Sequence, residues 1–281
     1  MNIERLRILV NAAYLLVYPA GVILLGVWLC KTGGGKDSLA AARVRRNNMP
    51  VMLGIVILFV WILGVSSLAP AVESAKAERG LQEWQAEALT YVLLGVFEVV
   101  LIAGMIFAGW YYFARQLRGF GLSGRNVIGD FWAAILNLAA ITPVVAGAVY
   151  LVYVIGKALL GEKFVMQQNE GIVDILAYSQ WSMRVIIFVF AVIVVPVFEE
   201  VLFRGIFQSL LVSIMNRPWA AIIVTSAFFS CLHPWMHWPA LFALSVCLGY
   251  SYEKSGSLMR PIFIHAIFNA VNLAVAVMQA G

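Results

Sequence analysis

Eight long apolar stretches decide what this chain can fold into. A helix that crosses a bilayer needs roughly 17 to 25 mostly apolar residues, and most of the stretches reach that length. The sixth and seventh are short and are interrupted by Pro234 and Pro239. The approximate bounds are Ile8 to Cys30, Pro50 to Pro70, Leu89 to Ala114, Phe131 to Leu160, Ser182 to Leu210, Trp219 to Leu232, Trp238 to Tyr250 and Pro261 to Met278. The pattern predicts an all-α, polytopic membrane protein of about eight transmembrane helices.

The composition leads to the same class of protein. Of the 281 residues, 63% are hydrophobic and only 12% are charged, whereas a soluble domain carries about 25% charged residues. A soluble core could not bury that much apolar surface. We therefore expect an integral, multi-pass protein of the cell membrane, with the lipid bilayer as its surroundings.

The charged loops predict an orientation, because Lys and Arg concentrate on the cytoplasmic side of membrane proteins. The loop after the first stretch and the loop after the third are basic, and the loop between them is largely acidic. The basic side chains are Lys31, Lys36, Arg43, Arg45, Arg46, Arg115, Arg118 and Arg125, and the acidic ones are Glu73, Glu78, Glu83 and Glu87. This places the loop Lys31 to Asn48 in the cytoplasm, and the loop Val72 to Glu87 and both termini outside. Topology thus explains the net charge of +5, and no nucleic-acid partner is expected.

A few polar side chains interrupt the apolar stretches. Each charge at the centre of a membrane helix costs about 2.5 to 3.5 kcal/mol on insertion scales, so a functional role is the default hypothesis for such groups. They are Glu98, Asn137, Glu199, Glu200, Arg204, His233, His265, Asn269 and Asn272. Most of them fall between Phe198 and Asn269, which makes the last third of the chain the candidate functional region.

Helical spacing predicts different surroundings for the two adjacent glutamates. Glu200 and Arg204 are four residues apart, so they share a helix face and can form a charge-assisted pair. Glu199 points about 100° away, lacks this local partner, and is free to face a cavity and take a proton from water. Pro196 removes a backbone donor, and we expect it to bend the helix beside the carboxylates.

Two further pairs have the same spacing. His265 and Asn269 aim an imidazole and an amide at one spot, which suits the stabilisation of an oxyanion. Phe229 and His233 place an aromatic ring and an imidazole on one face. Each pair also has a purely structural interpretation, as a buried ion pair or as hydrogen bonds between helices, and it is their combination that favours a site.

Together these residues resemble the motifs of a known family. EEVLFR (Glu199 to Arg204) fits EExxxR, FSCLH (Phe229 to His233) fits FxxxH, and HAIFN (His265 to Asn269) fits HxxxN. In this order they resemble the CPBP intramembrane glutamic endopeptidases, which include the type II CAAX prenyl endopeptidase and Abi-type, immunity-related proteins. The resemblance covers about Ile186 to Met278. We expect one continuous membrane domain, with unassigned helices in residues 1–180 and a catalytic core in residues 181–281.

The resemblance implies a membrane protease whose site lies within the bilayer. Glu199 and His233 would activate the attacking water, Glu200 and Arg204 would hold the site in place, and His265 and Asn269 would stabilise the oxyanion. No metal and no cofactor is implied in this scheme. Two glutamates and two histidines can also ligate zinc, so a metal site stays an alternative, although the HExxH motif of zinc proteases is absent.

The expected substrate is a peptide or a membrane protein, for example a prenylated C-terminus, a leader peptide or a membrane-protein segment. Two other functions stay open at this point. The chain could be a non-catalytic scaffold or immunity protein of the same family, or a small proton-coupled transporter that uses the same buried carboxylates and histidines. Glu98 lies outside the motifs, where it would pair with a basic group, stay protonated or line the cavity. The sequence indicates no oligomeric state.

Overall fold

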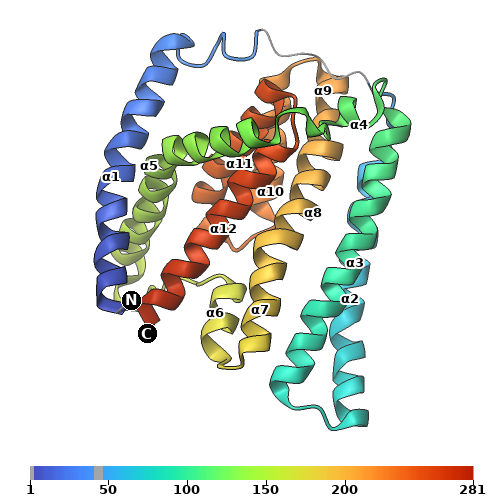
Figure 1. Ribbon diagram of the computed structural model, residues 1–281, viewed down its shortest axis with the longest axis vertical. Helices are drawn as coiled ribbons and strands as arrows, with labels where there is room; N and C mark the ends of the chain where they lie inside the picture. Colours follow the sequence, from blue (N-terminus) through green and yellow to red (C-terminus); the bar gives the residue numbers. More distant parts are fainter. Residues whose placement is uncertain (1–2, 41–46, 281) are drawn as a thin grey trace.

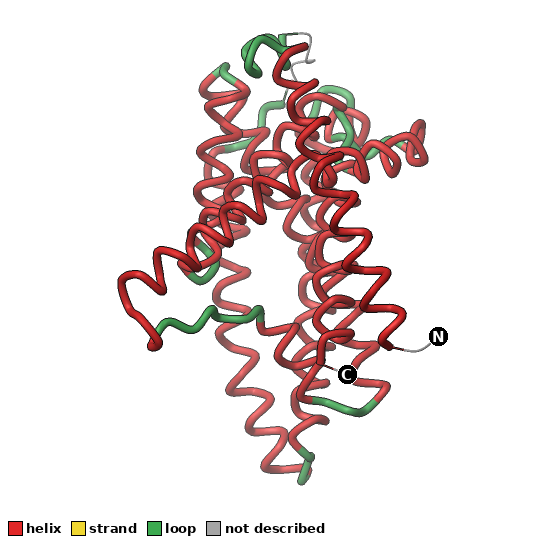
Figure 2. Tube along the Cα trace, turned by 90° about the vertical axis from the view of Figure 1, so that its left-hand side faces the viewer, coloured by secondary structure: helices red, strands yellow, loops and turns green. Residues whose placement is uncertain are grey.

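The computed structural model describes residues 3–40 and 47–280, and these residues form helices joined by short loops, without a named β-strand (Figures 1 and 2). The first half contains α1 (Ile3–Lys31), α2 (Val51–Arg79), α3 (Glu83–Tyr112), α4 (Gln116–Phe120), α5 (Val127–Leu160) and α6 (Glu170–Ala177). The second half contains α7 (Trp181–Val189), η3 (Phe190–Val194), α8 (Val195–Glu200), η4 (Val201–Gln208), α9 (Ser209–Met215), α10 (Pro218–Cys231), η5 (Trp235–His237), α11 (Trp238–Ser255) and α12 (Met259–Ala280). The all-α prediction is confirmed.

The eight apolar stretches all lie in helices, but they differ in length. Within the described residues, five helical segments are long and apolar enough to cross a membrane: 51–79, 83–112, 127–163, 181–215 and 259–278. The shorter apolar helices include Pro218–Cys231, which at 1.5 Å per residue is about 21 Å long. The prediction of a polytopic membrane protein is therefore confirmed, whereas the number of about eight crossings is not.

The loops before α2, after α3 and before α12 meet at one end of the molecule. The backbone N–H of Asn48 donates to Tyr112 O (3.2 Å), and the N–H of Leu258 donates to Gly121 O (2.9 Å). The turn between α2 and α3 lies at the opposite end, and the start of α1 and the end of α12 lie toward that end too (Figure 1). The basic loops thus share one side, as the charge pattern predicts. Arg43, Arg45 and Arg46 lie outside the described residues.

The fifth apolar stretch forms one long helical run with two π-helical segments, η3 and η4, on either side of α8. Wider π turns within α-helices are frequently found at functional sites. Pro196 lies in the first turn of α8, directly after η3, and both glutamates of the first motif complete this helix. The carboxylates therefore lie on a short α-helical segment between two irregular ones.

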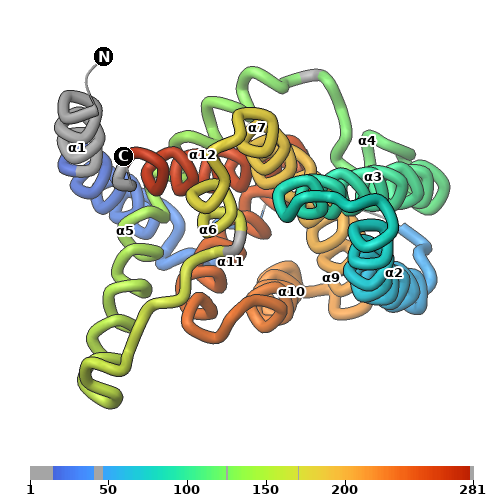
Figure 3. Tube along the Cα trace, turned by 90° about the horizontal axis from the view of Figure 1, so that it is seen from below, coloured from blue at the N-terminus to red at the C-terminus, as the bar shows by residue number. Residues whose placement is uncertain are grey.

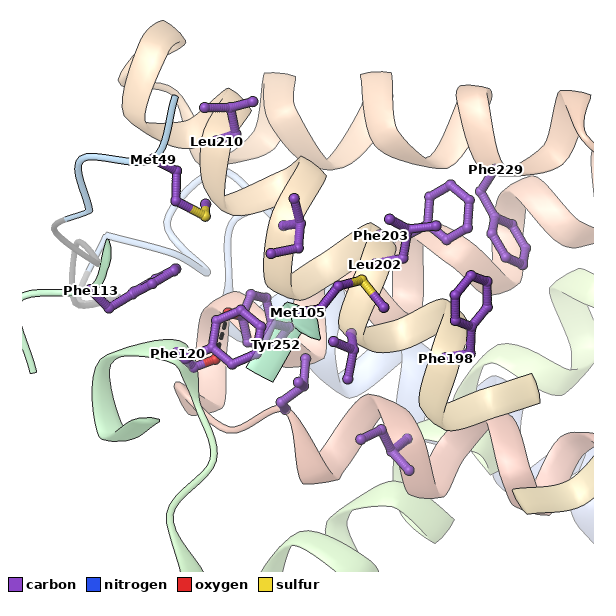
Figure 4. Close-up of a cluster of buried hydrophobic side chains, with 14 residues drawn as sticks. Met49, Met105, Phe113, Phe120, Phe198, Leu202, Phe203, Leu210, Phe229 and Tyr252 are labelled. Atoms are coloured by element: carbon purple, nitrogen blue, oxygen red, sulfur yellow. Dashed lines mark hydrogen bonds between the residues drawn. The ribbon is translucent and has the colours of Figure 1, made fainter. Parts of the chain in front are cut away.

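A cluster of buried apolar side chains packs this run against α3, α10, α11 and α12. Its members are Met49, Met105, Phe113, Phe120, Phe198, Val201, Leu202, Phe203, Ile206, Leu210, Phe229, Tyr252, Leu258 and Ile262. Phe203 and Phe229 meet edge to face at 5.1 Å between ring centroids, next to Phe198 (Figure 4). This apolar core packs η4, the segment that follows α8, against α10.

Glycines let the loop after α3 insert into the core. The buried ring of Phe120 lies against Gly109 of α3 and Gly205 of η4, where an added Cβ would approach ring atoms to 2.6 and 2.5 Å. A larger residue at either position would displace the ring. Tyr252 of α11 donates its hydroxyl proton to Phe120 O (2.9 Å), which fixes the same loop from the other side (Figure 4).

At the opposite end, the short helix α6 covers the start of α7 and the last turns of α12 (Figure 3). Ile175 of α6 packs with Met183, Ile187 and Leu273 in a second apolar cluster. Tyr91 of α3 donates a hydrogen bond to Asp174 (2.5 Å), so α6 is tied to α3 as well. The helices that precede residue 181 thus contact the C-terminal third directly.

We expect a labelling experiment to give the orientation of this arrangement. In a cysteine-free background, Lys36→Cys should resist a membrane-impermeant thiol reagent in intact cells and react after permeabilisation, because the charge pattern predicts a cytoplasmic position for the basic loop. Glu78→Cys, at the other end of the molecule, is the matched control and should react in intact cells. Both side chains are exposed. Labelling of Lys36→Cys in intact cells would reverse the predicted topology.

Candidate active site

The centre of the site is the buried ion pair between Glu200 of α8 and Arg204 of η4. The Nε of Arg204 lies 3.1 Å from Oε2 of Glu200, and both side chains have an exposed fraction of 0%. Two buried charges are stable only when each is paired, so this contact allows both groups to lie inside the bilayer. The four-residue spacing of the motif therefore forms the pair that it predicts.

His265 of α12 joins the two glutamates. Its Nδ1 lies 3.0 Å from Oε1 of Glu200, and its Nε2 lies 3.7 Å from Oε2 of Glu199. Because an ionised carboxylate only accepts hydrogen bonds, Nδ1 of His265 carries the proton in the contact with Glu200. Both oxygens of Glu200 thus have a partner: Oε1 has a hydrogen bond with His265, and Oε2 has an ion-pair contact with Arg204 that does not meet hydrogen-bond geometry.

Glu199 has a different environment from its neighbour. Its side chain is 16% exposed, whereas that of Glu200 is fully buried. Its contact with His265 exceeds hydrogen-bond distance, although it lies close enough to interact electrostatically with both His265 and His233. Of the two carboxylates, Glu199 is therefore the one that is accessible and free to bind a further molecule.

Phe229 and His233 lie on one face of the α10 end, as their spacing predicts. Their rings are 4.8 Å apart, and the ring of Phe229 is 6.2 Å from that of His265. The Nδ1 of His233 lies 2.9 Å from Phe229 O. Since a carbonyl only accepts, Nδ1 is the donor, and the neutral imidazole keeps its lone pair on Nε2. The nitrogen without a proton is thus Nε2.

The sequence interpretation missed two supports of Arg204. Its Nη2 donates to the hydroxyl and the carbonyl oxygen of Ser245 on α11, at 2.9 and 3.2 Å. Its guanidinium carbon also lies 5.3 Å from the centroid of the Phe229 ring, a cation–π contact. Ser245 lies on a helix that carries none of the three motifs, and no local pattern links it to Arg204.

Asn269 contacts the same helical run as His265, but one turn further along α12. Its Nδ2 donates to Ala191 O (2.8 Å), a carbonyl in the π-helical segment η3. The amide thereby anchors α12 to the irregular part of the run. An amide nitrogen carries two protons, so Asn269 retains a second donor.

The remaining histidine, His237, lies outside the three motifs, in η5 close to His233. It is half-buried, and this burial lowers the pKa of His237, against the opposing effect of a hydrogen bond with the backbone of Gln167. Burial therefore favours the neutral ring of His237. Its spacing from the motifs gave no signal for a role.

The donor groups do not form a preassembled metal site. Among the residues that the structure describes, no group of three or more His, Cys, Asp or Glu side chains is placed to hold a metal ion. Glu200 contributes no free oxygen, because Arg204 and His265 occupy both.

Comparison with known proteins gives a match for the part of the chain that carries this site. Residues 180–271 match the family model described as "Type II CAAX prenyl endopeptidase Rce1-like". The match contains all three motifs and agrees with the resemblance that they indicated. It supports a protease-like function for an integral membrane protein, and it does not extend to the helices before residue 180.

One relative comes from Bacillus subtilis (strain 168), the uncharacterized protein YpbD. It is 31% identical over 104 residues, which is 37% of this chain and 51% of the relative. The matched part thus spans about half the length of YpbD. No solved structure matches the chain significantly.

Proposed function

We propose that the chain is an intramembrane endopeptidase in which Glu199 and His233 activate a water molecule that attacks a peptide bond. The observation that carries this proposal is the contrast between the two glutamates. Glu200 is locked between Arg204 and His265, while Glu199 is partly exposed and has no cationic side chain at hydrogen-bond distance. A carboxylate held in this way is available as a general base.

The reaction needs one proton acceptor and, later, one proton donor. Water bound between Glu199 and Nε2 of His233 would lose a proton to Glu199 as its oxygen bonds to the scissile carbonyl carbon. The tetrahedral intermediate then collapses, the C–N bond breaks, and the same proton passes to the leaving amine. No covalent acyl-enzyme forms, and each residue returns to its starting state.

Negative charge develops on the carbonyl oxygen during this attack. We assign His265 and the second amide proton of Asn269 to it, since preorganised donors in a water-poor site stabilise such charge strongly. Because Nδ1–H of His265 is held by Glu200, His265 donates to the oxyanion through Nε2–H, as an imidazolium. Glu200 holds His265 in place through its contact with Nδ1, and Arg204 holds Glu200. Glu200 acts through His265, so it is a positioning residue rather than a group that contacts the substrate.

The site limits the kind of substrate. It lies within a bilayer-embedded core among Phe198, Phe203 and Phe229, so the scissile segment must enter an apolar environment. A peptide with a lipidated C-terminus satisfies this requirement, and the matched family description names prenylated CAAX sequences. Leader peptides and membrane-protein segments meet the same criterion.

Cleavage by the purified chain tests the proposal. In nanodiscs, the protein should hydrolyse a quenched fluorescent, farnesylated CAAX peptide. Activity should persist after prolonged treatment with EDTA and 1,10-phenanthroline, because the proposed base needs no metal ion. It should also persist after treatment with serine and cysteine modifiers, since no such nucleophile takes part.

His233→Ala protein that remains folded is the matched control and should be inactive. Loss of activity on chelation with recovery on adding zinc would replace the water-activating scheme by a metal site. No cleavage of lipidated, leader or membrane-protein peptides by folded wild-type protein would favour the non-catalytic scaffold.

A further inference from the structure

A seventh polar residue belongs to the surroundings of the site. Glu98 of α3 is only 3% exposed, although it lies in a long apolar helix. Its Oε1 accepts a hydrogen bond from Nε1 of Trp61 on α2 (3.3 Å). Its Oε2 is buried and has no hydrogen-bond partner. A buried polar atom without a partner is uncommon and calls for a physical explanation.

Glu98 lies beside the proposed base. The ring of Trp61 packs against that of Phe198, the residue before Glu199, with 5.6 Å between centroids. Glu98 and Glu199 lie close enough to interact electrostatically, and α3 packs directly on α8. Glu98 and Trp61 therefore pack next to the helix that carries the proposed base, and both come from the N-terminal helices.

The protonation of Glu98 decides whether its Oε2 accepts or donates a hydrogen bond. No ion pair joins Glu98 to a cation in the described part of the chain, and a lone carboxylate in apolar surroundings, next to a second carboxylate, is costly. In a neutral carboxyl group, the oxygen that accepts from the indole is the carbonyl oxygen. The proton is then on Oε2, so the atom without a partner is a hydrogen-bond donor that lacks an acceptor.

We propose that Glu98 is a substrate-positioning residue, whose Oε2–H donates to a backbone carbonyl of the peptide beside the bond that Glu199 attacks. The inference deepens the proposed function and rests on it for the identity of the substrate. An extended peptide brings unpaired carbonyl groups into the bilayer, where each needs a donor. Glu98 supplies one such donor from an otherwise apolar stretch of α3.

Binding in a Glu199→Gln background tests this role separately from cleavage. The probe is a dansylated, farnesylated CAAX peptide added to protein in nanodiscs. Adding Glu98→Leu should weaken binding about tenfold, because the substrate carbonyl loses its donor. Adding Glu98→Gln should restore binding to within about twofold, since an amide keeps both a donor and an acceptor for Trp61.

Two controls separate positioning from folding. Trp61→Phe keeps an aromatic ring against Phe198 but releases Oε1, so binding should weaken about threefold. Asp130→Asn removes another buried carboxylate, which pairs with Arg260 at 2.9 Å and takes no part in the proposed site, and it should leave binding unchanged. Thermal unfolding of each variant shows whether the fold is intact.

Equal binding by Glu98→Leu and its parent would overturn the proposal, because a structural or water-bound carboxyl has no effect on the peptide. Equal weakening by Glu98→Gln and Glu98→Leu would overturn the donor assignment. Absence of probe binding in the Glu199→Gln parent also counts against the proposal. Weakened binding in Glu98→Leu and restored binding in Glu98→Gln, without cleavage by the wild type, would support the positioning role of Glu98. The same result would refute the protease function.

Discussion

Glu199→Gln should lower kcat by about 10²- to 10⁴-fold, the range that a positioned general base contributes. Glutamine has the same shape but cannot take a proton from water. Its effect on stability should be small, because Glu199 forms no ion pair with arginine and lies 3.7 Å from His265, beyond hydrogen-bond distance. Steady-state cleavage of a quenched peptide and thermal unfolding in detergent measure the two effects.

The adjacent residue provides the matched control. Glu200→Gln changes the same chemical group one position away, but it breaks the buried pair with Arg204 and the contact with His265. It should therefore reduce folded yield and melting temperature as well as activity. Full activity of Glu199→Gln would refute the proteolytic role of this site, and loss of both activity and fold would show that Glu199 is structural.

Local spacing carried most of the correct predictions. The four-residue interval between Glu200 and Arg204 fixes their contact, because helical residues four apart share a face. The same rule placed Phe229 next to His233. The apolar stretches predicted every long helix, since stretches of that length are stable in a bilayer only as helices or closed barrels.

Contacts between distant segments could not be predicted in this way. The bond between His265 and Glu200 joins residues 65 positions apart, and its existence depends on how α12 crosses α8. Ser245 and Trp61 gave no signal either, because serine and tryptophan are common in membrane helices without a functional role. Glu98 was visible as an unusual carboxyl group, but only the packing of α3 on α8 showed that it borders the site.

The π-helical segments are a second feature that the sequence did not reveal. Helical periodicity assumes 3.6 residues per turn, and η3 and η4 depart from it on both sides of α8. Pro196 predicted an irregularity near this point but not its form. One consequence is that Ala191 O is available to Asn269, which changes the surroundings expected for that amide.

Arg204→Ala should destabilise the protein by about 3 to 5 kcal/mol, the usual result of removing one partner from a buried ion pair. Glu200 would keep its charge at 0% exposure without a cation at 3.1 Å. The bonds to Ser245 and the contact with Phe229 would be lost as well. We expect low folded yield and a clearly lower melting temperature in detergent, measured beside the wild type.

Two variants test whether the uncompensated charge of Glu200 causes the loss of stability in Arg204→Ala. Lys76→Ala breaks the ion pair with Glu83, whose side chain is 79% exposed, so water can solvate the remaining carboxylate and the loss should be smaller. Glu200→Leu combined with Arg204→Leu removes both charges and should recover much of the stability, because apolar residues often replace buried pairs without penalty. The double variant should remain inactive, since His265 loses the partner of its Nδ1. If Arg204→Ala were as stable as the wild type but inactive, the arginine would act in the chemistry and not in holding the site together.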